Sequence, residues 1–103
     1  MLFRSLIIDD HKIVREGIAN IAKREGIEVV GEAGDKEEAI AMIAATTPDV
    51  ITVDLSLPDG NGLEIVRFAR RNDQRMGIVV LSILDDDSNL IACMNAEIGR
   101  AHV

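Results

Sequence analysis

The sequence is poor in aromatic residues. Its 103 residues include two Phe and neither Trp nor Tyr, while hydrophobic residues still make up 48% of the chain. The core must therefore be built from Ile, Val, Leu, Ala and Met, a composition that suits parallel strands covered by helices. A single cysteine, Cys93, excludes an internal disulfide, and no signal-peptide pattern or long apolar run is found. We therefore expect a cytoplasmic chain without a membrane segment.

Positive charge is also scarce. Lys and Arg number 11 against 18 Asp and Glu, which gives a formal net charge of −7. A nucleic-acid backbone requires a basic surface, so we expect no direct nucleic-acid binding by this segment. The balance favours a cation or a basic partner, and the length supports one small domain.

The most informative stretch is 50–62. An apolar, β-branched run ends there in a carboxylate, Asp54, and a loop punctuated by Pro58, Gly60 and Gly62 follows. A buried parallel strand presents a single polar group at a sheet edge in this way. Asp also closes strands by hydrogen bonding to its own turn, and this second explanation of Asp54 stays open.

The apolar pattern predicts alternating strands and helices. Short apolar runs predict strands at 2–8, 28–33, 50–54 and 77–82. Helical spacing predicts helices at 11–25, from Asp35 to before Pro48, at 62–72 and at 85–95. Asp35 followed by Glu38 resembles a capping box. The alternation predicts an α/β fold with a parallel sheet and helices on both faces.

Polar residues stand where three of the predicted strands end. Asp9 and Asp10 follow the first strand, Asp54 ends the third, and Ser82 ends the fourth. Ligands of such sheets bind outside the carboxyl ends of the strands. If the first and third strands are neighbours, three carboxylates converge, and a proton or a divalent cation must relieve their repulsion. Oxygen ligands without His or Cys suit Mg²⁺.

Each of these residues also has a simpler explanation. One of the two acids at the end of the first strand can cap the helix that begins at His11. Ser82 can be ordinary polarity at a strand end. We expect His11 to be an exposed residue of the first helical turn rather than a metal ligand.

Three blocks carry a resemblance to a known family. They are Leu-Ile-Ile-Asp-Asp-His, Val-Asp-Leu-Ser-Leu-Pro-Asp-Gly-Asn-Gly-Leu-Glu and Val-Val-Leu-Ser, in this order and separation. Together they resemble the receiver domain of two-component response regulators, over Met1 to about Ala96. The stretch Asp-Asp-His-Lys-Ile-Val-Arg-Glu-Gly-Ile further resembles the NarL/FixJ (LuxR-type) subfamily, in which a receiver precedes a helix-turn-helix DNA-binding domain.

The resemblance implies a role for each site residue. Asp54 matches the phosphoacceptor, which takes a phosphoryl group from a sensor histidine kinase or a small acyl phosphate. Asp10 matches a direct Mg²⁺ ligand and Asp9 its partner, partly through water. Asp54 is also a metal ligand, and Ser56 matches the position that offers a backbone carbonyl. Ser82 matches the switch hydroxyl that bonds the new phosphate and couples the chemistry to the shape of the surface.

The resemblance also implies a flavodoxin-like, doubly wound sheet. After Ala96 the sequence departs from the pattern of the family. In the family a fifth strand with an aromatic switch residue, a lysine and a fifth helix follow. Here the aromatic position falls near Ala101 and the lysine beyond Val103, and the residues 97–103 resemble a translated DNA-sequencing adapter. We expect an incomplete receiver at 1–96 with strand order 2-1-3-4, a non-native tail at 97–103, a missing output domain, and self-association through the exposed sheet edge.

Two classes of function follow from these residues. The first is a signalling module, a Mg²⁺-dependent phosphoacceptor that is not a turnover enzyme. The second is a small Mg²⁺-dependent phosphatase or hydrolase with Asp54 as its nucleophile. A turnover enzyme is expected to place a general acid or base near its nucleophile, and Asp59 has no convincing partner for that role. An inactive truncated fragment is a further alternative.

Overall fold

The structure is a computed structural model that describes residues 3–81. Within them the elements are β1 (Arg4–Ile8), α1 (Lys12–Arg24), β2 (Glu28–Ala33), α2 (Lys36–Thr46), β3 (Val50–Asp54), the 3₁₀ turn η1 (Pro58–Gly60), α3 (Asn61–Asn72) and β4 (Gly77–Leu81). The predictions for Ser82, the helix at 85–95, the missing fifth strand and helix and the tail at 97–103 lie outside the described residues.

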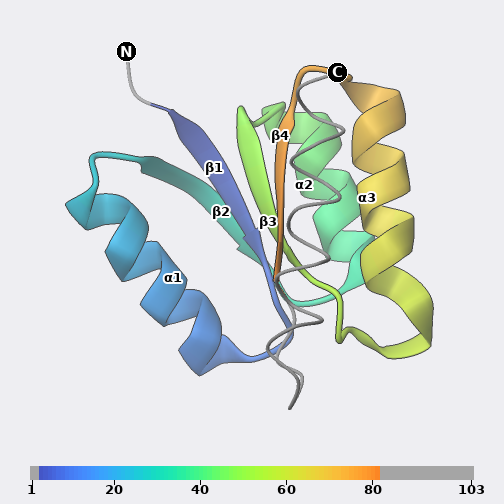
Figure 1. Cartoon of the computed structure of the whole chain (residues 1–103), viewed down its shortest axis with the longest axis horizontal. Helices are drawn as coiled ribbons and strands as arrows, with labels where there is room; N and C mark the ends of the chain where they lie inside the picture. Colours follow the sequence, from blue (N-terminus) through green and yellow to red (C-terminus); the bar gives the residue numbers. More distant parts are fainter. Residues whose placement is uncertain (1–2, 82–103) are drawn as a thin grey trace.

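The four strands form one parallel sheet in the order β2-β1-β3-β4. Helix α1 covers one face, and α2 and α3 cover the other, as Figure 1 shows. The flavodoxin-like α/β fold and the strand order 2-1-3-4 predicted from the sequence are therefore confirmed. Most predicted bounds agree to within one or two residues, the usual uncertainty of helix and strand ends.

The core lies mainly between the sheet and the helices α2 and α3. Every second strand residue faces these helices: Leu6 and Ile8 in β1, Ile51 and Val53 in β3, and Ile78 and Val80 in β4. All six are buried, and they pack with buried side chains from α2 and α3: Ala39, Ile43, Ile65, Val66 and Ala69. The period-2 alternation therefore assigns one face of each strand to this core.

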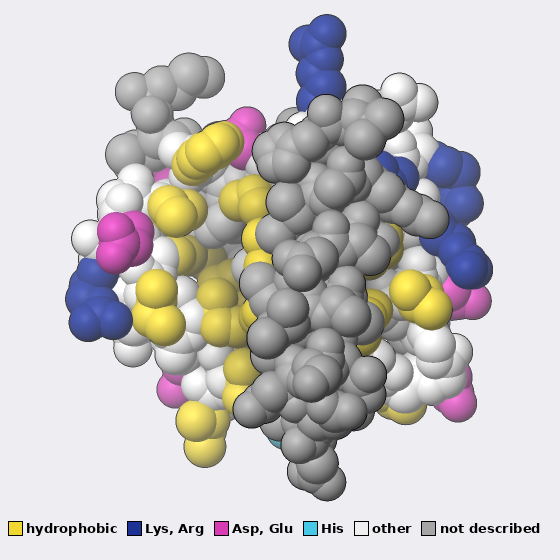
Figure 2. All heavy atoms as spheres, viewed as in Figure 1, with side chains coloured by type: hydrophobic (Ala, Val, Ile, Leu, Met, Phe, Trp, Pro, Cys, Tyr) yellow, Lys and Arg dark blue, Asp and Glu magenta, His cyan; other side chains and the backbone are white. Residues whose placement is uncertain are grey.

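Among residues 3–81, α1 is the only helix on the opposite face of the sheet. Helix α1 buries Ala19 and Ala22, whereas Ile13 is 83% and Ile21 is 54% exposed. Beside α1 lies an apolar hollow of about 210 Å³, lined by Ser5, Ile7, Ile18, Ile21, Ala22, Ile27, Val50, Thr52 and Val79. Figure 2 shows hydrophobic side chains gathered on the side of the molecule where Figure 1 places α1. The apolar spacing thus predicted the helix, but only part of its apolar face contacts the sheet.

Helix α2 begins as the sequence predicted. The Asp35 carboxylate accepts a hydrogen bond of 2.8 Å from the backbone N–H of Glu38. The Glu38 carboxylate accepts from the N–H of Gly34 at 3.3 Å, one residue before the N-cap. Half of the capping box is therefore present in its usual form, and the other half is displaced by one residue.

Among residues 3–81, no helix is long and apolar enough to cross a membrane.

Candidate functional site

The sheet brings the ends of β1 and β3 together. These strands are parallel neighbours, and their register pairs Ile8 with Val53. The residues that follow, Asp9 and Asp54, therefore emerge side by side at the carboxyl edge. The N–H of Asp9 donates to the carbonyl of Ala33 at the end of β2, at 3.0 Å. On the other side, Asp54 pairs with Leu81 at the end of β4.

Four side chains gather at this edge. Asp9, Asp10, His11 and Asp54 each offer one ligand atom, and these atoms all lie within 4.8 Å of one another. Asp9 and Asp54 are buried, at 2% and 1% exposure, whereas Asp10 and His11 are exposed. The structure thus brings together the three carboxylates that the strand order was expected to converge.

The two carboxylate oxygens of Asp54 have different surroundings. Oδ1 accepts hydrogen bonds from the hydroxyl of Ser56 at 2.6 Å and from its backbone N–H at 2.8 Å. Oδ2 is buried and has no hydrogen-bond partner among the described residues. A buried oxygen without a partner is energetically costly. The turn-closing explanation of Asp54 therefore accounts for one oxygen and leaves the other available.

The acids after β1 do not act as the N-cap of α1. The N-cap is His11, and it makes no side-chain capping hydrogen bond. Instead, the Asp9 carboxylate accepts from the N–H of His11 at 2.8 Å. The His11 ring, 58% exposed, places Nδ1 at 3.2 Å from Oδ1 of Asp9 and 2.9 Å from Oδ1 of Asp10. Neither acid is therefore the N-cap of α1, contrary to the simpler explanation of these residues.

The sequence did not predict two of the contacts at the site. His11 was expected to be exposed, which is correct, but its ring also contacts both neighbouring acids. Arg15 donates from Nη1 to the backbone carbonyl of Asp9 at 2.6 Å and from Nε to Glu32 at 3.3 Å. Arg15 thereby ties the turn after β1 to α1 and β2. The spacing of Asp9 and Arg15 in the sequence does not predict this hydrogen bond, because it depends on the path of the turn between them.

A glycine allows α3 to start close to Asp54. A Cβ atom added to Gly62 would lie 2.8 Å from the carbonyl oxygen of Asp54 and 3.0 Å from the Cα of Leu55. Both are backbone atoms, which cannot move aside cheaply. Before it, Asp59 and Gly60 adopt positive φ angles of 61° and 71°. The loop therefore turns sharply and packs α3 against the end of β3.

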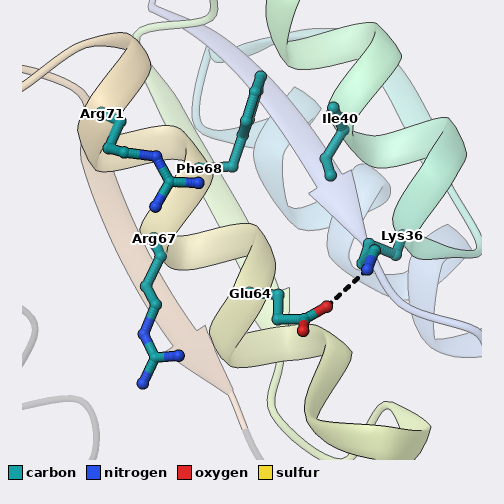
Figure 3. Close-up of a pocket in the computed structure, with 6 residues that line it drawn as sticks. All are labelled: Lys36, Ile40, Glu64, Arg67, Phe68 and Arg71. Atoms are coloured by element: carbon teal, nitrogen blue, oxygen red, sulfur yellow. Dashed lines mark hydrogen bonds and ion pairs between the residues drawn. The ribbon is translucent and has the colours of Figure 1, made fainter.

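A second hollow lies between α2 and α3, in a different part of the surface. It has a volume of about 320 Å³ and is lined by Lys36, Ile40, Glu64, Arg67, Phe68 and Arg71. Figure 3 shows Lys36 of α2 facing Glu64 of α3, with Nζ and Oε2 2.6 Å apart. The hydrogen bond and charge of Lys36, with a smaller effect of Arg67, hold the pKa of Glu64 below its usual range. This ion pair joins α2 to α3, and Glu64 is the only carboxylate among the described residues that line the hollow.

Fold and site together define a doubly wound parallel α/β domain with carboxylates clustered at the carboxyl ends of its strands. Residues 5–101 match the response regulator receiver domain family. The chain belongs to this family of two-component signalling domains. Receiver domains transmit signals rather than turn over a substrate, and they bind Mg²⁺ at an acidic pocket.

Similar proteins agree with this assignment. The chain is 36% identical over 96 residues to the DNA-binding transcriptional activator DevR/DosR of Mycobacterium tuberculosis, covering 90% of this chain and 44% of that protein. It is 34% identical over 95 residues to the nitrate/nitrite response regulator NarP of Escherichia coli, covering 91% and 44%. A crystal structure of a LuxR-family response regulator from Aurantimonas sp. SI85-9A1 superposes with a TM-score of 0.78 at 35% identity, covering 96% of this chain and 70% of that one.

The predicted resemblance to receiver domains and to their LuxR-type branch is therefore confirmed. The chain spans less than half the length of these two curated relatives.

Proposed function

We propose that this chain is the phosphoacceptor module of a cytoplasmic two-component transcriptional regulator, and that Asp54 takes the phosphoryl group. The observation that carries the proposal is the state of the Asp54 carboxylate. It is buried at the carboxyl edge of the sheet, with Oδ1 held by Ser56 and Oδ2 without a partner among residues 3–81. One oxygen is thus fixed, and the other is available as a nucleophile.

In the proposed reaction, Oδ2 of Asp54 attacks the phosphorus of the donor. A phosphorus–oxygen bond to Asp54 forms, and the bond between phosphorus and the donor's leaving group breaks. With an acyl phosphate the leaving group departs as a carboxylate, and with a sensor histidine kinase it is the imidazole of a phosphohistidine. The product is an aspartyl phosphate, a form of covalent catalysis by a carboxylate. The two hydrogen bonds from Ser56 orient the carboxylate for this attack.

We further propose Mg²⁺ as the cofactor of the site, and the residues fit such an ion. The donors are carboxylate oxygens, which Mg²⁺ prefers, and the close approach of three acids favours the binding of a cation. Asp9, Asp10 and Asp54 would hold the ion together with the backbone carbonyl of Ser56. When bound, Mg²⁺ offsets negative charge on the transferring phosphoryl group.

The proposed partners follow from the resemblance and the relatives. A sensor histidine kinase is the proposed phosphate donor, and a helix-turn-helix DNA-binding domain is the proposed output. DevR/DosR is named as a DNA-binding transcriptional activator, and this chain covers 44% of it. Ser82 is the proposed switch hydroxyl that bonds the new phosphate. The two charges that phosphorylation adds are enough to bias a two-state loop.

We also propose that the chain self-associates through the exposed edge of its sheet. Among the described strands, β4 pairs with β3 alone, so it forms one end of the sheet. The apolar hollow beside α1 adjoins it, since Val79 of β4 and Ile21 of α1 both line this hollow. Apolar edges and patches of this kind recruit other chains.

A further proposal concerns the domain boundary. We place the receiver at 1–96 and treat 97–103 as a non-native tail, although the family match extends to residue 101. Sequencing the source DNA across the codon for Ala96 tests this boundary. The proposal expects adapter sequence at that junction, and a genomic reading frame that encodes the heptapeptide would refute it.

Stoichiometry with acetyl phosphate and Mg²⁺ tests the proposed function. The receiver proposal expects at most one phosphate incorporated per chain, with none in Asp54→Asn. Asp59→Asn is the matched control, because Asp59 is an exposed acid of η1 that should not affect incorporation. Many turnovers of acetyl phosphate per chain would instead favour the hydrolase, and failure to incorporate any phosphate would favour an inactive fragment.

A further inference from the structure

We propose that the hollow between α2 and α3 is a docking site for an acidic peptide segment of a partner protein. The hollow has a volume of about 320 Å³ and is lined by Lys36, Ile40, Glu64, Arg67, Phe68 and Arg71. The inference does not depend on the proposed phosphorylation, because none of these residues belongs to the acidic cluster at the edge of the sheet.

One face of α3 supplies most of the lining. Four of the six residues come from α3, at positions 64, 67, 68 and 71. This spacing of i, i+3, i+4 and i+7 places them in one stripe along the helix. Lys36 and Ile40, four residues apart on α2, face this stripe, as Figure 3 shows. The hollow is therefore a groove between two helices and does not depend on a loop.

The groove is positively charged, although the chain as a whole is acidic. Three of its six side chains are cationic and one is a carboxylate, whereas the formal net charge of the chain is −7. Figure 2 shows Lys and Arg side chains on the side of the molecule where Figure 1 places α3. Glu64 is engaged with Lys36, with 2.6 Å between Oε2 and Nζ. Neither Arg67 nor Arg71 has an ion-pair partner within residues 3–81, so both guanidinium groups are available to a carboxylate.

The groove also has an apolar part. Ile40 and Phe68 are both partly exposed, and Phe68 packs against the core. Leu63, which is 49% exposed, lies in the same i, i+4, i+8 row of α3 as Arg67 and Arg71. A nucleic-acid backbone has no apolar side chain to place on this surface, and the net negative charge of the chain repels it. The surface therefore favours a peptide that combines acidic with apolar side chains.

The separation of the two arginines indicates the form of the peptide. Residues four apart in a helix are offset by about 6 Å along its axis. In an extended peptide, side chains two residues apart lie on one face about 7 Å apart, and the side chain between them points to the other face. A segment with the pattern acid–apolar–acid can therefore pair its two carboxylates with Arg67 and Arg71 while its apolar side chain contacts Phe68.

Fluorescence anisotropy of the full chain with a labelled peptide tests the inference. The probe has the sequence Glu-Leu-Glu-Leu-Glu, and Lys-Leu-Lys-Leu-Lys is the control of opposite charge. We expect Arg67→Gln/Arg71→Gln to weaken binding of the acidic probe about fivefold or more at low salt. Lys23→Gln/Arg24→Gln is the matched control variant, because it removes two exposed charges from the last turn of α1. It should change the affinity by less than about twofold.

Two further measurements separate docking from a loss of folded protein. Glu64→Gln removes the only carboxylate among the described residues of the hollow, so it should strengthen binding of the acidic probe about two- to threefold. A loss of folded protein cannot produce this gain. A Glu-Ser-Glu-Ser-Glu probe should bind more weakly than the leucine probe, because it buries no apolar side chain in the groove.

Several results would overturn the inference. They include no binding of the leucine probe at millimolar concentration and equal affinity of the wild-type chain and Arg67→Gln/Arg71→Gln. If a single-stranded oligonucleotide displaces the probe and loses as much affinity in the arginine variant, the groove binds a phosphate backbone instead. If sedimentation velocity without peptide shows a dimer that only the arginine variant dissociates, the occupant is a second copy of this chain and not a partner protein.

Discussion

Gly62 occupies a position with no room for a side chain. A Cβ atom there would lie 2.8 Å from the backbone oxygen of Asp54 and 3.0 Å from Leu55 Cα. We predict that Gly62→Ala lowers the free energy of unfolding by about 1–3 kcal/mol, because α3 must move away from the end of β3. Urea denaturation followed by circular dichroism measures the change.

Gly17→Ala is the matched control for that substitution. Gly17 lies in α1, is exposed, and would have no atom within 4 Å of an added Cβ. Because alanine is the better helix former, we expect Gly17→Ala to stabilise the chain by about 0.5–1 kcal/mol. Equal losses of stability in the two variants would contradict the close packing at Gly62.

The Lys36–Glu64 pair gives stability a specific dependence on pH. Lys36 holds the pKa of Glu64 below the ordinary glutamate value of 4.5, so the folded state favours the ionised carboxylate. This contribution is fully present above pH 4.5 and is lost as the pH falls through the lowered pKa. We predict that Glu64→Gln is slightly less stable than wild type at pH 7 and equally stable once Glu64 is protonated.

Unfolding curves between pH 2 and pH 7 measure this effect. Glu16→Gln is the control, since Glu16 is exposed and makes no ion pair among residues 3–81. A loss of stability in Glu64→Gln that is as large in acid as at neutral pH would refute the ion-pair explanation. Because the pair is exposed, 1 M salt should also reduce the effect.

The sequence predicted that three carboxylates lie together at the sheet edge, but not all of their contacts. Asp9, Asp10 and Asp54 could be placed together because parallel strands end at one edge. The ring of His11 and the guanidinium of Arg15 could not, because their contacts depend on the path of the turn after β1. Likewise, the different surroundings of the two Asp54 oxygens depend on how the chain turns at Ser56.

At the scale of elements, the N-cap of α2 is a discrete source of stability. The Asp35 carboxylate satisfies the N–H of Glu38 at 2.8 Å. We predict that Asp35→Ala lowers the free energy of unfolding by about 1 kcal/mol, whereas Asp35→Asn, which keeps an acceptor oxygen, changes it by a few tenths. Thermal or urea denaturation compares the variants. If alanine and asparagine cost the same, the capping bond is not the source of the effect.

The regular elements were the most predictable feature of the chain. The bounds of β2 and β3 agree with prediction because Gly, Pro and Asp mark their ends, and β3 is a continuous β-branched run. The burial of α1 was not predictable in the same way. Its apolar spacing is clear, yet Ile13 and Ile21 remain exposed, because burial depends on what covers the sheet beside the helix.

At the scale of the whole molecule, the apolar hollow beside α1 determines the expected association. Ile21 lines this hollow and is 54% exposed, whereas Ile13 is exposed and does not line it. We predict a concentration-dependent dimer in sedimentation velocity that Ile21→Lys shifts towards the monomer. Ile13→Lys adds the same charge outside the hollow and should leave association unchanged. A wild-type chain that stays monomeric at all concentrations would contradict the proposed self-association.

The proposed role of Asp54 as the phosphoacceptor of a Mg²⁺-dependent receiver can be tested directly. The direct measurement is to treat the full chain with acetyl phosphate and Mg²⁺, reduce it with borohydride, and locate the modified residue by peptide mass spectrometry. Borohydride converts an aspartyl phosphate to homoserine, so the modified position is marked permanently. We expect homoserine at position 54, dependent on Mg²⁺ and absent in Asp54→Asn. Modification at Asp9, Asp10 or Asp59, or modification that persists in Asp54→Asn, would contradict it.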